Sequence, residues 1–389
     1  MSDELKGSPD ERSSFISHPS PGKVAVIHDW LTGMRGGEAV LEGILAALPQ
    51  ADLFTLFHFP GSVSHAIESH RIVTSSLQRM ATRVRDYRHL LPLFPRAARE
   101  FDLREYDLVV SSSHCVAKGV AAHGKPHLSY CHTPMRYVWD RFDDYFPRSK
   151  PLRRAAAMSI APWLRTWDRR TASEVTTFVA NSTFVRERVR RYYGRDAEIV
   201  HPYVADAFLN APLADARGDY HLIVSALVPY KRIELPIDAM RGRTLVIIGS
   251  GPLLAQLRAR SGPNVELMGP VSRDRIIERL GRARSLILPG VEDFGITPLE
   301  AMALGTPVVA LGEGGVRDSV VDGVTGIFFE PAAVESLRRA LHAVESRPWD
   351  REALRAHAST FSRAVFDAKF RAALSNRGRA SSRQDGRAG

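Results

Sequence analysis

Short apolar runs alternate with amphipathic helical patterns along the first half of the chain. The run Lys23–His28 predicts a buried strand, and residues 38–48 carry apolar side chains at helical spacing, so we expect a helix there. Further runs predict strands over residues 52–57, 106–111, 127–130 and 177–180. Buried strands that alternate with helices are typical of a doubly wound parallel sheet.

The same alternation begins again near Tyr220 and predicts a second domain of the same class. Its apolar runs predict strands over residues 221–225, 244–249, 265–268, 285–288, 307–310 and 326–329. We therefore predict an α/β protein with two Rossmann-like, doubly wound domains that face each other across a cleft. A loop-like stretch, Pro202–Gly218, is the expected hinge between them.

These patterns divide the chain into four parts. We expect disordered tails at residues 1–21 and 376–389, because both are rich in polar and charged residues. The two domains are expected at residues 22–202 and 203–375. The helical pattern over Trp349–Ser375 closes the second domain and is a candidate to cross back to the first.

Composition adds expectations about location. The chain has 389 residues, of which 44% are hydrophobic and 25% charged, as in a soluble globular protein. Cys115 and Cys131 are its only cysteines, so no disulfide framework is predicted and a reducing cytoplasm is expected. The sequence shows no secretory signal and no apolar stretch long enough for a membrane span.

The charge balance points to an anionic partner, because the formal net charge is +10 and the pI is ≈ 9.8. Nucleic acid is the least favoured, since no zinc-finger spacing, aromatic RNA-binding motif or heptad-linked basic region occurs. Seven arginines within residues 79–104 surround the apolar run Leu90–Pro95, which suits contact with an anionic membrane surface. The alternative is a solvated helix face whose apolar stripe faces the core.

The segment Pro289–Glu300 carries two carboxylates, Glu292 and Glu300, directly after the apolar run 285–288. Glu292 is expected on the loop at the carboxyl end of a strand, where open α/β sheets bind ligands, and Glu300 in the first turn of the next helix. We expect backbone N–H groups to face this crevice and to bind phosphate or sugar oxygens. They are those of Phe294, Gly295, Ile296 and Thr297. The alternative is structural, because Thr297 and Glu300 also have the spacing of a helix capping box.

Three other predicted strand ends carry residues suited to an anionic ligand. Lys231 and Arg232 follow the first strand of the second domain, and two adjacent cations there suit a diphosphate. Glycines at two further strand ends would let a phosphate or sugar approach the backbone: Gly36 and Gly37 in the first domain, Gly249 and Gly251 in the second. Each feature also has an ordinary interpretation, as a solvated basic loop or a strand–helix turn.

His132 lies on a proline-broken loop after a first-domain strand and would point into the cleft, with His114 as a second candidate. A lone histidine, however, is more often structural than catalytic. The glycines near residue 36 do not form the dinucleotide-binding fingerprint, and no Gly-x-Ser-x-Gly elbow supports a serine hydrolase. No Cys/His spacing fits zinc and no Asp-x-Asp occurs, so we predict neither a metal site nor a cofactor.

The Glu292–Glu300 segment resembles the Glu-x7-Glu motif of retaining glycosyltransferases of family 4, which have the GT-B fold. The resemblance extends over roughly residues 23–370. Within it, Lys23–Glu38 and Tyr130–Trp139 look like the bacterial surface-polysaccharide branch, whose members are often mannosyltransferases.

This resemblance implies a role for each candidate residue. Glu300 would hold the ribose of the donor nucleotide, Glu292 would lie near the transferred sugar, and Lys231 would bind the diphosphate. Further matches are the cleft histidine His132, the donor-side glycines Gly36 and Gly37, and the backbone of Phe294, Gly295 and Ile296, which would meet sugar hydroxyls. One departure is Ala226, because the family often has an arginine there, so a diphosphate cation is missing unless Arg232 replaces it.

The implied activity is retaining, metal-independent transfer of a hexose, with mannose favoured, to a lipid-linked or oligosaccharide acceptor in polysaccharide biosynthesis. The donor would be a nucleoside-diphosphate sugar, with GDP-mannose favoured. The protein would then be cytoplasmic and peripheral at the inner face of the cell membrane. Alternatives are a GT-B epimerase or phosphorylase, and a catalytically degenerate GT-B module that binds a membrane or a partner.

Overall fold

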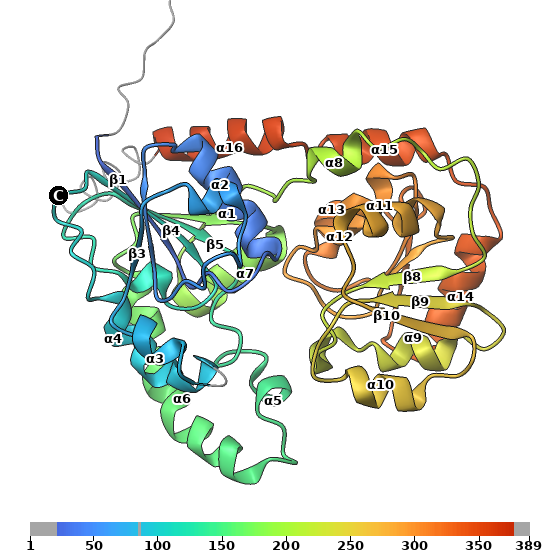
Figure 1. Cartoon of the computed structure of the whole chain (residues 1–389), viewed down its shortest axis with the longest axis horizontal. Coiled ribbons are helices and arrows are strands. Elements are labelled where there is room, and N and C mark those ends of the chain that lie inside the picture. Colours follow the sequence, from blue (N-terminus) through green and yellow to red (C-terminus); the bar gives the residue numbers. More distant parts are fainter. Residues whose placement is uncertain (1–21, 85–86, 377–389) are drawn as a thin grey trace, which may run out of the picture.

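A computed structural model describes residues 22–84 and 87–376 of the chain. The predicted tails at residues 1–21 and 377–389 lie outside the described residues. Asn376, which we expected to begin the second tail, instead ends the last helix. The described chain forms two parallel sheets, each covered by helices (Figure 1).

The first sheet has seven parallel strands in the order β3-β2-β1-β4-β5-β6-β7. Its strands are β1 (Val24–His28), β2 (Asp52–Thr55), β3 (Ile72–Thr74), β4 (Leu108–Ser113), β5 (His127–Cys131), β6 (Thr177–Ala180) and β7 (Glu198–Ile199). The sequence patterns missed β3 and β7, the two edge strands, because two or three residues are too few to show a periodicity.

The second sheet has six parallel strands in the order β10-β9-β8-β11-β12-β13. They are β8 (His221–Val224), β9 (Leu245–Ile248), β10 (Val265–Gly269), β11 (Leu286–Leu288), β12 (Val308–Leu311) and β13 (Gly326–Phe329). Buried aliphatic side chains predominate in the four inner strands β9, β8, β11 and β12, as expected for a sheet covered on both faces, whereas the edge strand β10 has none. Two doubly wound α/β domains confirm the predicted fold class.

Helices connect the strands in both domains. In the first domain and the linker they are α1 (Gly36–Ala47), α2 (His65–Glu68), α3 (Gln78–Ala81), η1 (Tyr87–Leu93), α4 (Phe94–Ala98), η2 (Ala117–Gly119), α5 (Phe142–Tyr145), α6 (Pro151–Ala172), α7 (Thr183–Tyr193) and α8 (Asp206–Leu209). In the second they are η3 (Pro229–Lys231), α9 (Glu234–Ala239), α10 (Leu254–Arg260), α11 (Arg273–Arg282), α12 (Thr297–Ala303), α13 (Val316–Ser319), α14 (Val334–Glu345) and α15 (Arg351–Ser359), followed by α16 (Arg363–Asn376).

The strand order changes direction at the same place in both sheets. β1 lies beside β4 in the first sheet and β8 beside β11 in the second, so neighbouring connections leave in opposite directions. In open α/β sheets such a switch point leaves a crevice at the carboxyl ends of the strands, where ligands bind. The loops after β1, β4, β8 and β11 are therefore the first places to look for a site.

The chain passes between the domains twice, and the last helix lies against the first domain. The two crossing segments contact each other, since the Val204 N–H donates to the Phe361 carbonyl at 3.0 Å. From there α16 runs along α1, with Phe366 and Phe370 buried in the first-domain core (Figure 1). Gly43 permits this packing, because a Cβ there would lie 2.6 Å from the Phe366 ring.

The segment that we expected to expose an apolar patch to a membrane is mostly core. Leu90, Phe94 and Pro95 are buried, and Phe94 packs against Trp30 and Phe57. Leu93 alone among the large apolar side chains of this run is exposed, at 41%. The prediction of an exposed apolar patch over Leu90–Pro95 was therefore wrong, because Leu90 and Phe94 belong to the hydrophobic core that packs on the first sheet. Arg85 of that surface lies outside the described residues.

Candidate active site at the junction of the two domains

The Pro289–Glu300 loop lies against the loop that carries Lys231. A Cβ on Gly290 would lie 2.7 Å from the Tyr230 carbonyl oxygen and 2.8 Å from the Lys231 Cα, so glycine is needed for this approach. The result is an ion pair between Lys231 Nζ and Glu292 Oε1, with each side chain 16% exposed. The structure thus brings together two of the predicted catalytic residues.

Arg232 follows Lys231 at the end of η3 and adopts a left-handed backbone conformation, with φ of +52°. Its side chain is half-buried and forms no hydrogen bond or ion pair with the residues that the structure describes. A guanidinium without a partner beside Lys231 is suited to an anionic ligand. Ala226, in the preceding loop, is exposed, and its methyl side chain supplies no cation.

Glu300 does not form the capping box that its spacing allowed. Helix α12 begins at Thr297 with Ile296 as its N-cap residue, and no side chain caps it. Among the described residues, none donates a hydrogen bond to the Glu300 carboxylate or forms an ion pair with it. Burial raises the pKa of Glu300 to about 7, opposed only by the charge of Arg273. A carboxylate whose pKa is raised by burial, and which has no partner among the described residues, is a candidate ligand-binding group.

The three residues before α12 have different environments. The Phe294 side chain is buried and stacks on His201 with ring centroids 5.5 Å apart, so only its backbone could face a ligand. Gly295 has a φ of +84°, which turns the chain into the helix. Ile296 faces the first domain, because its Cδ1 atom lies 3.5 Å from the position of a Cβ on Gly36.

Gly249 and Gly251 are needed for packing within the second domain. A Cβ on Gly249 would lie 1.9 Å from the Ser225 carbonyl oxygen, and one on Gly251 would lie 2.4 Å from that of Leu227. The two glycines let the loop after β9 pass close to the loop after β8, which leads to Lys231. A role for them in binding a nucleotide stays a prediction.

On the first-domain side, α1 begins next to His132. Gly36 and Gly37 are its first two residues, and a Cβ on Gly37 would lie 3.9 Å from His132 Nε2. His132 is nearly buried and its Nε2 lies 2.8 Å from the Ser112 hydroxyl. Burial lowers the pKa of His132 well below its usual value, and the charges of neighbouring histidines act in the same direction. The imidazole is therefore neutral at pH 7.

Sequence reasoning missed the polar residues behind His132. His28 Nδ1 lies 3.0 Å from the same Ser112 hydroxyl, and His28 Nε2 lies 3.8 Å from the buried Glu38 carboxylate. Asp29 accepts four backbone hydrogen bonds from residues 114–117 and lies 3.1 Å from His114 Nδ1. Their position at the end of the predicted first strand was a usable signal, since ligand sites form at such ends.

A second group that sequence reasoning missed joins the two domains. The Asp293 carboxylate of the second domain forms ion pairs with Arg136 and, at 2.7 Å, with Arg188 of the first. The Ser182 hydroxyl donates to the Asp293 carbonyl oxygen at 2.5 Å. Burial acts to raise the pKa of Asp293, but the charges of Arg136 and Arg188 outweigh it and lower that pKa. Asp293 therefore stays ionised, next to Glu292, at the domain junction.

Neither a metal-binding cluster nor a membrane-spanning helix is found in the part of the chain that the structure describes. No group of three or more His, Cys, Asp or Glu side chains within residues 22–84 and 87–376 could hold a metal ion. No described helix is both long enough and apolar enough to cross a bilayer. Whether the protein acts without a metal stays a prediction.

Two family models match the chain, one on each domain. The model described as Glycosyltransferase Family 4 matches residues 34–206, and the model described as Glycosyl transferases group 1 matches residues 206–361. Consecutive matches of this kind cover both faces of the domain junction described above.

Curated relatives match over part of their length. A GDP-mannose-dependent alpha-(1-6)-phosphatidylinositol monomannoside mannosyltransferase of Mycolicibacterium smegmatis is 33% identical over 218 residues, 47% of this chain and 56% of that protein. A D-inositol 3-phosphate glycosyltransferase of Kribbella flavida is 32% identical over 127 residues, 30% of each chain. The matched region thus spans between about a third and just over half of these relatives.

Solved structures match over nearly the whole chain. Anabaena Alr3699/HepE in complex with UDP-glucose has a TM-score of 0.66 at 16% identity and covers 91% of this chain and 100% of its own. The lipopolysaccharide outer core galactosyltransferase WaaB has a TM-score of 0.62 at 17% identity, with coverage of 91% and 99%. At this identity the likeness shows the fold.

The two facing α/β domains have the GT-B fold, and the two family models make the protein a glycosyltransferase of that fold. The chain belongs to family 4 of these glycosyltransferases, as the two consecutive family models over residues 34–361 together show.

Proposed function

We propose that this protein is a retaining glycosyltransferase that moves a hexose, with mannose favoured, from a nucleoside-diphosphate sugar to a lipid-linked or oligosaccharide acceptor in polysaccharide biosynthesis. The observation that carries the proposal is the junction where Lys231 and Glu292 lie on one side and the amino terminus of α1 and His132 on the other. The unpartnered Glu300 carboxylate adds a group suited to ribose hydroxyls.

The proposed chemistry uses positioning and charge. The bond between the sugar C1 and the diphosphate oxygen breaks, and the nucleoside diphosphate leaves as an anion that Lys231, Arg232 and the amino terminus of α1 stabilise. The acceptor hydroxyl attacks C1 from the same face, and its proton passes to the leaving phosphate oxygen. The neutral His132 imidazole would hydrogen-bond the sugar, and Glu292 would lie near it.

The choice of donor rests on the comparisons. The Mycolicibacterium relative uses GDP-mannose, which supports a GDP-linked mannose donor, whereas the Anabaena structure contains UDP-glucose. A glycosyltransferase without a metal needs protein cations for the diphosphate, and Lys231 and Arg232 supply two. We therefore propose that no metal ion is required.

Replacement of Lys231 by alanine tests the diphosphate site. We expect Lys231→Ala to lower the rate of sugar transfer by at least about 100-fold, because a charge that stabilises the leaving group is lost. Lys369→Ala, which removes an exposed lysine on α16, is the matched control and should keep the wild-type rate. Circular dichroism would establish that both variants are folded. A folded Lys231→Ala protein with wild-type activity would refute the assignment.

Calorimetric titration with GDP, UDP and ADP, each with and without EDTA, tests the donor. Tight binding of one nucleotide that EDTA leaves unchanged would support a metal-independent donor site, and GDP would favour mannose. No binding by any of the three would contradict the site built on Lys231 and Glu300. That result would favour a phosphorylase or a catalytically degenerate GT-B module, for which the missing cation at Ala226 is the best argument.

A further inference from the structure

The first half of α6 exposes three large apolar side chains: Leu152 is 88% exposed, Met158 56% and Trp163 50%. Leu152 and Trp163 are eleven residues apart, about three helical turns, so they lie on one face, the outer face of α6. Met158 is turned about 120° away from that face. Figure 1 shows this part of α6 extending away from the first sheet, beyond the other helices of its domain. An exposed apolar surface of this kind marks an interaction site.

The first half of α6 and the loop before it carry only positively charged side chains. No Asp or Glu occurs between Pro147 and Trp167, and the cations in that stretch are Arg148, Lys150, Arg153, Arg154 and Arg165. Arg154 is neutralised by Asp143 at 2.6 Å. The side chains of Arg148 and Lys150 are exposed and form no hydrogen bond or ion pair with the described residues. The surface is therefore both apolar and cationic.

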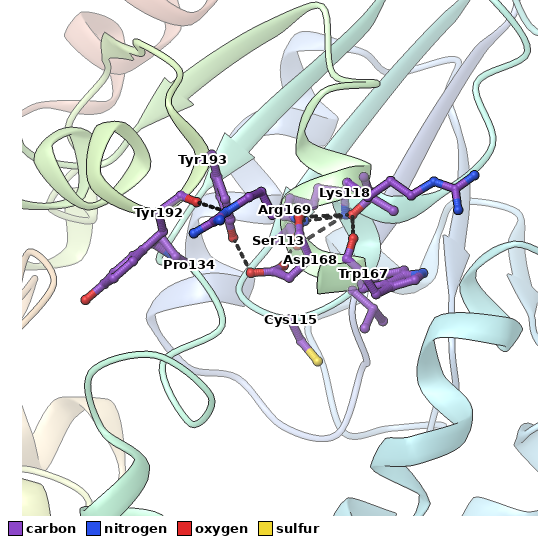
Figure 2. A network of polar contacts seen from close by, with 12 residues as sticks. Ser113, Cys115, Lys118, Pro134, Trp167, Asp168, Arg169, Tyr192 and Tyr193 are labelled. Atoms are coloured by element: carbon purple, nitrogen blue, oxygen red, sulfur yellow. Dashed lines mark hydrogen bonds and ion pairs between the residues drawn. The ribbon is translucent and has the colours of Figure 1, made fainter. Parts of the chain in front are cut away.

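The second half of α6 is fixed to the domain by a buried ion pair. Lys118 Nζ lies 2.8 Å from Asp168 Oδ1, and both side chains are fully buried. The other Asp168 oxygen accepts hydrogen bonds from Tyr193 at 2.9 Å (Figure 2) and from Trp139 at 2.8 Å. The second half of α6 is thus held firmly against the domain, which fixes the position of the first half. The outer face itself contributes little to the core.

We propose that this outer face, formed by Leu152 and Trp163 with the cations Arg148 and Lys150, docks on an anionic lipid bilayer. Helices that lie in the membrane interface typically combine leucine and tryptophan with lysine and arginine. The absence of carboxylates between Pro147 and Trp167 favours an anionic lipid surface. The site gives the proposed glycosyltransferase access to a lipid-linked acceptor, but it rests on exposure and charge and not on activity.

Vesicle co-sedimentation of the full chain tests this proposal. Wild-type protein should bind vesicles that contain phosphatidylglycerol and bind pure phosphatidylcholine vesicles much more weakly. The double variant Leu152→Glu/Trp163→Glu should lose about tenfold or more in vesicle affinity. Two apolar side chains are replaced by carboxylates, which the anionic lipid headgroups repel. Val321→Glu/Val324→Glu adds the same charge at two exposed apolar positions of the second domain and is the matched control.

Several outcomes would overturn the proposal. Equal binding of Leu152→Glu/Trp163→Glu and the control would exclude this face, and equal binding to both lipids would exclude the role of charge. If sedimentation velocity without lipid showed a dimer that the first variant alone dissociates, the face would be a protein interface instead. Calorimetry with nucleotide is independent of these results, so a failed membrane site and a failed donor site can be told apart.

Discussion

At the scale of single residues, Glu300 shows how a group suited to ligand binding can lower the stability of the folded protein. A free glutamate has a pKa of 4.5, whereas burial raises that of Glu300 to about 7. Between these values the folded protein holds a proton that the unfolded chain releases, so the free energy of unfolding falls as the pH rises from about 4.5 to 7 and then levels off. The charged form that would bind ribose hydroxyls is therefore the less stable one.

We predict that Glu300→Gln stabilises the protein at pH 8 by about 1–2 kcal/mol, allowing for partial exposure of the carboxylate, and has little effect at pH 4.5. The same change should weaken nucleotide binding by about tenfold, because a charged hydrogen-bond acceptor is lost. Thermal melts at the two pH values and calorimetry measure these effects. Glu352→Gln, at an exposed position of α15, is the control. Lower stability of Glu300→Gln at pH 8 would show that the carboxylate has a structural partner.

At the scale of elements, the glycine at position 290 sets the distance between two loops. We expect Gly290→Ala to destabilise the protein by about 1–3 kcal/mol, because its Cβ would overlap backbone atoms that cannot move aside. The shift would separate Lys231 from Glu292 and weaken nucleotide binding. Gly281→Ala in α11 meets only ordinary contacts and should be neutral or slightly stabilising. Unfolding by urea and calorimetry would show both effects; Gly290→Ala behaving like Gly281→Ala would contradict this account.

Elements with a strong local pattern were predictable from the sequence. Buried strands such as β8 and β11 are visible in the sequence as apolar runs. The residues that follow these runs include Lys231 and Glu292, so the sequence alone predicted both as site residues. Exposure was not predictable in the same way, because an apolar run looks alike whether it faces the core or solvent. Leu90–Pro95 is therefore mostly core, whereas the exposed face of α6 carries Trp163, which the sequence did not single out.

At the scale of the whole molecule, the contacts that join the two domains could not be predicted from the sequence. Asp293 is 157 residues from Arg136 and 105 from Arg188, and no local pattern links positions so far apart. Their ion pairs hold the loop next to Glu292 against the first domain. Arg188 also pairs with Asp140 at 2.6 Å, so two carboxylates balance the two guanidinium groups. Removal of the Asp293 charge would leave an excess positive charge at the junction and should therefore have a large effect.

We predict that Asp293→Asn, which keeps the side-chain shape but not its charge, destabilises the protein by about 3 kcal/mol and loosens the domain junction. Small-angle X-ray scattering should then show a larger radius of gyration, and calorimetry should show weaker nucleotide binding, since Glu292 is no longer held in place. Asp274→Asn, at an exposed position of α11, is the matched control and should change neither quantity. If Asp293→Asn lowered stability but left the radius of gyration and nucleotide affinity unchanged, Asp293 would stabilise its own loop without holding the two domains together.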